Sequence, residues 1–161
     1  MMITKRMAVL ILIFLIIGFS IGCLYALIVT KFRTTETCTA SVVVFHKEVQ
    51  ANFTLDFMYN KKKQSGIVSI SGSFHQRNRA EGTIRRDISY SWIENKNTYH
   101  LLSTNIDKIE NVETLPDEVI ATVLPAFYVY PNKRVNYSIK SQGNSGFLFT
   151  VGKRPIFICA R

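Results

Sequence analysis

Two cysteines are the residues whose placement in this sequence most clearly predicts a chemical bond. Cys38 and Cys159 stand near the first and last residues of the chain that follows residue 30. The terminal strands of small β domains often lie side by side, so we predict a disulfide between these two cysteines. The bond would close a loop of about 120 residues and stabilise the fold by roughly 4–5 kcal/mol. Two unrelated buried thiols are the alternative.

The remaining reactive side chains form no recognisable catalytic or metal-binding pattern. The three histidines do not share the spacing of metal ligands, and we expect them on or near the surface; they are His46, His75 and His100. The sequence has no Cys-x-x-Cys, no phosphate-binding glycine loop and no nucleophile elbow. No pairing of carboxylates can be read from it either. We therefore predict a protein that is not an enzyme and has no metal or cofactor.

An uncharged stretch near the N-terminus predicts a membrane anchor. Residues 7–30 contain no charged side chain and are mostly apolar. As a helix they would span roughly 36 Å, which is enough to cross a hydrocarbon layer of about 30 Å. We predict a cytoplasmic N-terminus over 1–6, a transmembrane helix over 7–30, a tether over 31–38 and a single β domain over 39–161.

Two other fates would remove or modify the apolar stretch. A cleaved signal peptide has a shorter apolar region followed by small residues, whereas here the segment 31–33 reads Lys-Phe-Arg. Residues 20–23 fit a permissive lipidation box that ends at Cys23, but the apolar run continues beyond this cysteine. We favour an uncleaved anchor in which Cys23 is a small apolar helix residue. The sequence does not decide whether Cys23 is lipidated.

Charge and cysteine usage together predict the side on which the domain lies. Lys5 and Arg6 precede the anchor and Lys31 and Arg33 follow it, so the bias toward an N-terminus on the inside is weak. A disulfide favours an oxidising compartment and so places the domain outside. Without Lys5 and Arg6 the chain has 18 basic and 11 acidic residues, a net charge of +7. Such a surface suits anionic lipid or an acidic partner, and nucleic acid is not expected outside a membrane.

Alternating apolar and polar residues predict that the domain is mainly β. The clearest run is 49–59, where every odd position is apolar and polar residues fill all but one of the even positions. Turn-forming residues divide the rest into about eight strands in hairpin order. The expected strands are 40–45, 49–59, 67–74, 83–93, 98–103, 134–141, 147–151 and 156–159. A meander of this kind hides its edges best as a small antiparallel β-barrel or a strongly curved sheet.

Three local features stand out against the strand pattern. Residues 115–125 predict one short helix between two prolines, and residues 126–131 predict an extended aromatic stretch. Arg86 is the one charge on an otherwise apolar strand face. Lysines 61–63 and the pair 153–154 are expected at hairpin turns, as solvated residues or as contacts to anionic headgroups.

Several blocks of the sequence resemble the FidL-like membrane proteins of enteric bacteria. They are the Cys-Thr-Ala strand from Cys38, the Leu-Pro-Ala-Phe block from Leu124, the Gln-Gly-Asn block from Gln142 with its Phe-Leu-Phe-Thr tail, and the final Cys159. The resemblance implies a single-pass protein of the bacterial inner membrane with a periplasmic β domain. The layout of this family is similar to that of ToxS-type proteins, the small partners of ToxR-type regulators, which are single-span and carry a winged-helix DNA-binding domain.

Three functions are consistent with these features. The first is a non-catalytic accessory partner of a membrane-bound, ToxR-like transcription regulator, bound by sheet-edge addition. The second is a periplasmic sensor or carrier of an amphipathic small molecule, because the mouth of a small barrel can hold one ligand. Against it, four aromatic residues are expected simply to fill the core; they are Phe53, Phe57, Tyr90 and Trp92. The third is a passive envelope protein.

Overall fold

A computed structural model describes residues 2–32, 35–77 and 79–161. They divide into two compact units, Met1–Thr35 and Glu36–Arg161. The first unit holds helix α1 (Met2–Phe32), whose described apolar side chains are exposed all around the helix. Its stretch Leu10–Ile28 has a mean hydropathy of 2.7 and is long and apolar enough to cross a membrane, a property that signal sequences share.

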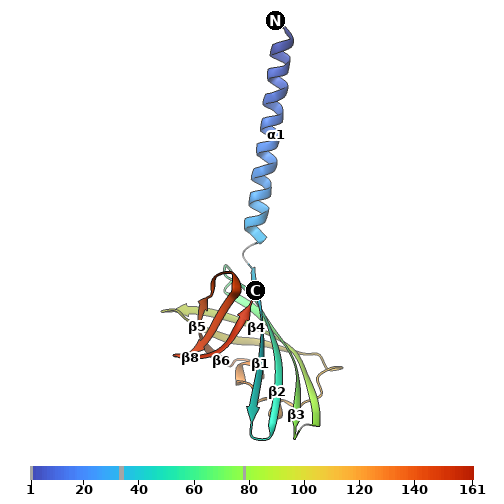
Figure 1. Cartoon of the computed structure of the whole chain (residues 1–161), viewed down its shortest axis with the longest axis vertical. Coiled ribbons are helices and arrows are strands. Elements are labelled where there is room, and N and C mark those ends of the chain that lie inside the picture. The colour runs from blue at the N-terminus through green and yellow to red at the C-terminus, as the bar shows by residue number, and fades with distance from the viewer. Residues whose placement is uncertain (1, 33–34, 78) are drawn as a thin grey trace. The chain divides into compact units, whose positions relative to one another are not determined.

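The second unit is mainly β, as the sequence predicted, and its strands form a closed antiparallel barrel in chain order (Figure 1). The strands are β1 (Thr35–His46), β2 (Val49–Asn60), β3 (Ser65–Gln76), β4 (Arg79–Asn95), β5 (Thr98–Lys108), β6 (Arg134–Ser141), β7 (Gly146–Val151) and β8 (Arg154–Ala160). All eight overlap the expected strands, and most are longer. The expected tether over 31–38 differs, because α1 continues to Phe32 and β1 begins at Thr35; positions 33 and 34 lie outside the described residues.

Alternation explains which side of each strand faces the interior. In β2 the odd positions 51, 53, 55 and 57 are buried, whereas Asp56 and Met58 are exposed. Strands β2, β3 and β4 pair along nearly their whole length and make the most regular wall of the barrel. A tight hairpin joins β4 to β5, with positive φ at both Lys96 and Asn97, the conformation that two-residue hairpin turns require.

The barrel is closed by much less pairing on its other side. Strand β6 pairs with β5 through its first half and with β7 through its second half. Strands β1 and β8 share one register position, Thr39 with Ala160. Beside that pair, Cys38 and Cys159 form the predicted disulfide, with their Cα atoms 5.3 Å apart. The covalent bond therefore stands where the hydrogen-bonded seam is shortest.

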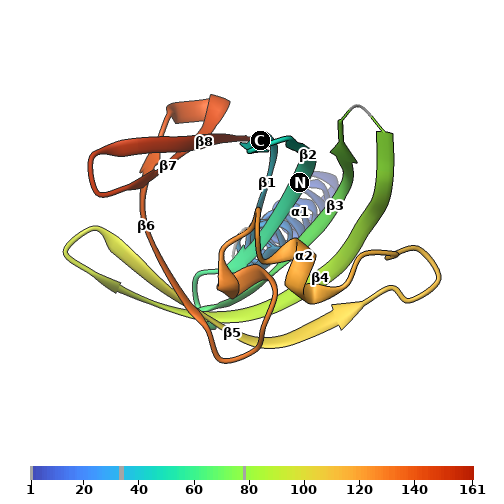
Figure 2. The same ribbon diagram turned by 90° about the horizontal axis from the view of Figure 1, so that it is seen from below.

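One end of the barrel is covered by the strap, which we define as residues 109–133 between β5 and β6 (Figure 2). The strap contains helix α2 (Asp117–Ile120) and the 3-10 turn η1 (Ala126–Tyr128). The short helix was predicted, but the extended conformation expected for 126–131 is wrong, because these residues form the 3-10 turn η1 followed by turn and bend residues. There the amides of Tyr128 and Tyr130 bond back to the carbonyls of Pro125 and Ala126, which brings Phe127 and Tyr128 into the core.

The strap is fixed to the barrel wall by Arg86, the charge that interrupts the apolar face of β4. Its side chain is fully buried and forms a two-pronged pair with the Glu113 carboxylate, with one N–O distance of 2.9 Å. A guanidinium nitrogen also lies 3.0 Å from Asp117, which Lys108 contacts from β5 at 2.7 Å. Since each charge has an opposite partner, the cluster holds the strap without leaving a buried ion unpaired.

Candidate functional site

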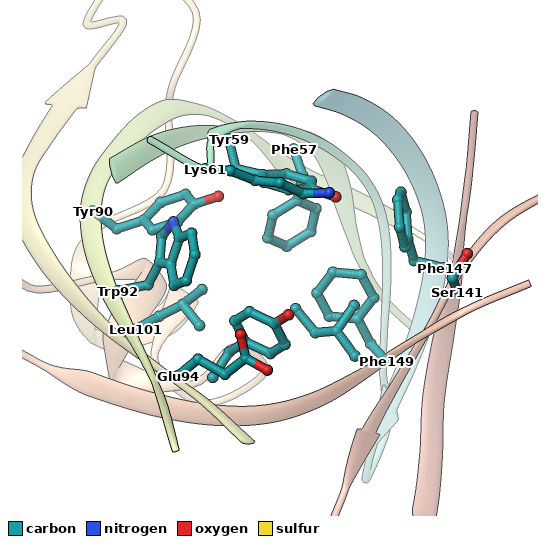
Figure 3. A pocket seen from close by; sticks show the side chains of 12 residues that line it. Phe57, Tyr59, Lys61, Tyr90, Trp92, Glu94, Leu101, Ser141, Phe147 and Phe149 are labelled. Carbon is teal, nitrogen blue, oxygen red and sulfur yellow. The ribbon is translucent and has the colours of Figure 1, made fainter. Parts of the chain in front are cut away.

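The barrel encloses a cavity of about 480 Å³ at the end opposite the strap. Lys61, Glu94 and Ser141 line it and are exposed, so the cavity opens to solvent there (Figure 3). The other lining residues are mostly aromatic or aliphatic: Phe57, Tyr59, Tyr90, Trp92, Tyr99, Leu101, Ile139, Phe147 and Phe149. A concave, mainly apolar space of this size with a few polar groups is typical of a small-molecule site.

The strand pattern places these side chains together. The cavity lies where β2, β4 and β6 finish and where β5 and β7 begin, so the inward-facing residues of five strands converge on one opening. Tyr90 fits into this wall because residue 66, on the neighbouring strand, is glycine. A Cβ atom at Gly66 would lie 2.5 Å from atoms of the Tyr90 ring. On its deeper side Tyr90 meets Phe127 of the strap, with ring centroids 6.1 Å apart.

Two polar groups belong to residues of the cavity wall. The indole Nε1 of Trp92 is buried and has no hydrogen-bond partner among the described residues. A buried N–H group without a partner costs free energy, so this position is a locally unfavourable one in the wall. The Tyr90 hydroxyl lies 3.5 Å from the Met58 carbonyl, at the limit of hydrogen bonding. Burial raises the pKa of Tyr90, so its phenol stays protonated and able to donate.

A charged cluster stands at the rim of the cavity. The carboxylate of Glu36, on β1, lies 2.5 Å from the Lys61 ammonium and 3.0 Å from the Arg161 guanidinium. It also accepts a hydrogen bond of 2.8 Å from the Tyr59 hydroxyl. Partial burial pushes the pKa of Glu36 upward, but the hydrogen bonds from Lys61, Tyr59 and Arg161 together outweigh it and lower the pKa to about 2.

The sequence-predicted residues divide between structural and site roles. Cys38 and Cys159 are bonded and buried, whereas Cys23 is a free, exposed cysteine of α1. The three histidines are not brought together, and the described residues contain no group of three or more side chains suited to a metal ion. The lysines of the turn 61–64 are exposed as expected, but Lys61 also pairs with Glu36 and lines the cavity.

The expectation that four aromatic residues fill the core is correct for Phe53, Phe57 and Tyr90, which are buried, whereas Trp92 is partly buried and packs against the core. Phe53 is buried and does not line the cavity, whereas Phe57, Tyr90 and Trp92 all do. Sequence reasoning did not single out Glu36 or Arg161. Residue 36 is two positions before Cys38 on the same strand, so the two side chains face the same side, toward the inside of the barrel. This alternation was the one signal in the sequence that could have indicated Glu36. Nothing in the sequence marks Arg161 as its partner across 125 residues.

Comparison with known proteins places the barrel in a family. The model of the YqeJ C-terminal domain matches residues 35–159. The chain belongs to the YqeJ family. The matched region begins at the first residue of β1 and ends at the second cysteine of the disulfide, so the family domain comprises nearly the whole barrel. The uncharacterized protein YqeJ of Escherichia coli (strain K12) is 43% identical over 157 residues, and the match covers 98% of each chain.

Proposed function

We propose that this YqeJ-family barrel is a non-catalytic binding domain for an amphipathic small molecule, held at a membrane by α1. The observation that carries the proposal is the cavity, whose wall is apolar and aromatic while its rim is charged. An amphipathic molecule would place its apolar part against that wall and its polar group at the rim. The strap supports the proposal because its buried side chains, Phe127 and Tyr128 among them, pack into the core at the other end of the barrel.

Trp92 provides a direct test, since it is the one tryptophan of the chain and lines the cavity. The full chain, kept soluble in a non-ionic amphipol polymer too large for the cavity, is titrated with deoxycholate and with laurate. We expect Trp92 emission to shift and the melting temperature to rise as binding saturates, because a ligand that binds only the folded form stabilises it. No change in either signal with either probe would rule out this function.

A pair of matched variants shows whether the probe occupies the cavity. Ser141→Phe adds a ring at the opening, and we expect it to weaken binding by about tenfold, or about 1.4 kcal/mol. Ser41→Phe adds the same ring at an exposed position of β1 that does not line the cavity, and binding should stay unchanged. Equal effects of the two substitutions would place the probe elsewhere on the molecule.

The setting we propose is the bacterial inner membrane, with α1 as a single-pass anchor, the N-terminus in the cytoplasm and the barrel in the periplasm. The length and hydropathy of Leu10–Ile28 support the anchor. The disulfide supports an oxidising compartment. Thiol labelling of intact cells and of spheroplasts, with a cysteine placed at exposed Ser145 or at Met2, tests the topology. Labelling from outside at position 2 would overturn it.

A second function has its own support in the seam between β1 and β8. Among the residues that the structure describes, Thr39 with Ala160 is the one register position that joins these strands, so the rest of each edge is left to accept another strand. Exposed apolar side chains stand beside the seam: Val43, Phe45, Ile156 and Ile158. The resemblance to FidL-like proteins supports the same idea, namely that the barrel is an accessory partner of a single-span, ToxR-like regulator and binds an extended segment of it.

Two isoleucines of equal exposure test the seam. Ile158 on β8 and Ile93 on β4 are both 62% exposed, and Ile158 alone lies at the seam. A single-span, ToxR-like regulator that is the partner should co-purify with the chain in detergent, and Ile158→Lys should abolish co-purification while Ile93→Lys preserves it. Failure of the wild-type chain to co-purify, together with unchanged regulator abundance after deletion, would count decisively against the partnership.

A further inference from the structure

The rim of the cavity contains a carboxylate receptor that is built from three separate parts of the barrel. Tyr59 belongs to the end of β2, Lys61 to the following turn and Arg161 to the C-terminus, and all three donate to the carboxylate of Glu36. Charge-assisted hydrogen bonds of this kind are stronger than neutral ones. The barrel thus gathers two cations and a phenol around one acid group.

The receptor is continuous with the cavity wall. Tyr59 and Lys61 both line the cavity. The Arg161 guanidinium lies 4.6 Å from the centroid of the Phe147 ring, another lining residue, which holds the cation by a cation–π contact. An acid group bound by these donors would therefore have an apolar, aromatic surface directly beside it.

The group that occupies the receptor in this structure comes from the chain itself. Glu36 faces inward from β1, two residues before the disulfide cysteine Cys38. Its carboxylate uses both oxygens, one toward Lys61 and the other toward Tyr59 and Arg161. The contact resembles a ligand in its site more than a structural ion pair, because Lys61 and Arg161 both keep substantial contact with solvent.

We infer, on the basis of the proposed function, that the cavity binds an amphipathic anion whose acid group replaces the Glu36 carboxylate on Lys61, Arg161 and Tyr59. The exchange conserves charge, because one carboxylate leaves as another arrives. Glu94, on the opposite side of the opening, adds a negative charge that makes the Lys61 side the favourable place for the anion (Figure 3). The apolar part of the ligand then covers the aromatic wall.

The exchange also affects the residues of β1 that precede the disulfide. Release of the Glu36 carboxylate removes its contacts with Lys61, Tyr59 and Arg161, while the disulfide at Cys38 retains the rest of the strand. Ligand binding would therefore loosen Glu36 and Thr37, the two residues before Cys38.

Matched probes and variants test the exchange in the full chain in non-ionic amphipol, with Trp92 emission as the signal. Laurate is the anionic probe, and dodecyltrimethylammonium is a cation with the same chain length. Removing the competing acid by Glu36→Gln should tighten laurate binding about fivefold, the equivalent of about 1 kcal/mol. Lys61→Gln should weaken laurate binding by a similar factor, and Glu36→Gln should not strengthen binding of the cation.

Glu48→Gln is the control, because Glu48 forms an exposed ion pair with Arg77 at the other end of the β1–β2 hairpin. It should leave laurate affinity unchanged. Hydrogen exchange adds a readout that a purely structural ion pair would not change: amides at 36–37 should exchange faster when laurate is bound.

The outcomes separate the two proposals. If laurate binds but Glu36→Gln leaves its affinity unchanged or lowers it, the exchange is refuted and the binding function stands. The same holds if the cation binds more tightly than laurate. If neither probe binds the wild type or Glu36→Gln, both proposals fail together.

Discussion

The two ends of the barrel are both held by ionic clusters, but the clusters differ in burial and in what surrounds them. At the strap end, Arg86 and Glu113 are almost completely excluded from water, and their partners Asp117 and Lys108 complete the set. At the open end, Glu36 is partly exposed, and its partners Lys61 and Arg161 are more exposed still. Both ends therefore use the same chemistry in different solvent environments.

This difference assigns the two clusters different roles. A buried ion pair is costly to break, because removing one partner leaves the other charge without water or a counter-ion. A pair at the rim can exchange partners, since water and incoming ions replace what is lost. The strap end is thus a fixed closure, and the open end is where a ligand would enter under the proposed function. Each prediction below tests one side of this contrast.

The largest effect is expected from the disulfide, which closes the seam at the open end. Because β1 and β8 share a single register position, the bond between Cys38 and Cys159 replaces a hydrogen-bonded ladder. Replacing both cysteines by alanine should lower the free energy of unfolding by about 5 kcal/mol. Urea denaturation followed by Trp92 emission measures it. Cys23→Ala is the matched control and should change nothing; an equally stable double variant would show that backbone pairing alone closes the barrel.

The next largest effect is expected at the strap end. Arg86→Ala leaves the Glu113 carboxylate buried without its partner, so we expect a loss of about 4 kcal/mol in the free energy of unfolding. The neighbouring Arg85 has the same charge but is only partly buried, and Arg85→Ala should cost about 0.5 kcal/mol or less. If the two substitutions cost the same, the fixed character of the strap end is disproved.

A smaller effect at the same end concerns a pair of buried tyrosines. The hydroxyls of Tyr128, on the strap, and Tyr137, on β6, lie 2.9 Å apart. Tyr128→Phe should cost about 1–2 kcal/mol, because it leaves the Tyr137 hydroxyl unpaired. Replacing both by phenylalanine should cost less than the sum of the single changes. Additive costs would mean that the hydroxyls contribute independently of each other.

Strands and the disulfide could be predicted because their signals are local or topological. Alternation over 49–59 and turn residues fix the strands whatever the rest of the chain does. The pairing of Cys38 with Cys159 follows from their places at the two ends of a β meander. The conformation of the 126–131 stretch was mispredicted because aromatic residues suit both strands and buried turns, and tertiary packing decided in favour of turns.

The cavity and its rim lay beyond sequence reasoning for a physical reason. Whether Phe57, Tyr90 and Trp92 only fill a core or also line a cavity depends on the diameter of the barrel, which no strand encodes alone. The pairing of Glu36 with Arg161 depends on closure of the barrel across the full length of the chain. Arg86 was visible as an anomaly on its strand, but its partners Glu113 and Asp117 belong to the strap, whose course the pattern did not reveal.

The smallest effect is expected at the open end, where acid should weaken the rim cluster. The pKa of Glu36 falls from 4.5 to about 2 on folding, so the folded state binds its proton less readily than the unfolded state. The stabilisation is therefore complete above pH 4.5 and is lost as the pH falls toward 2. Because the side chains of Lys61 and Arg161 are 61% and 38% exposed, water screens the cluster, and we expect a contribution of only about 1 kcal/mol.

Glu36→Gln should remove this part of the pH dependence, and Glu48→Gln should preserve it, when denaturation is compared at pH 6 and pH 3. An unaltered pH dependence in Glu36→Gln would show that the rim acid is not bound by its neighbours, and the contrast between the two ends would then reduce to the buried cluster alone.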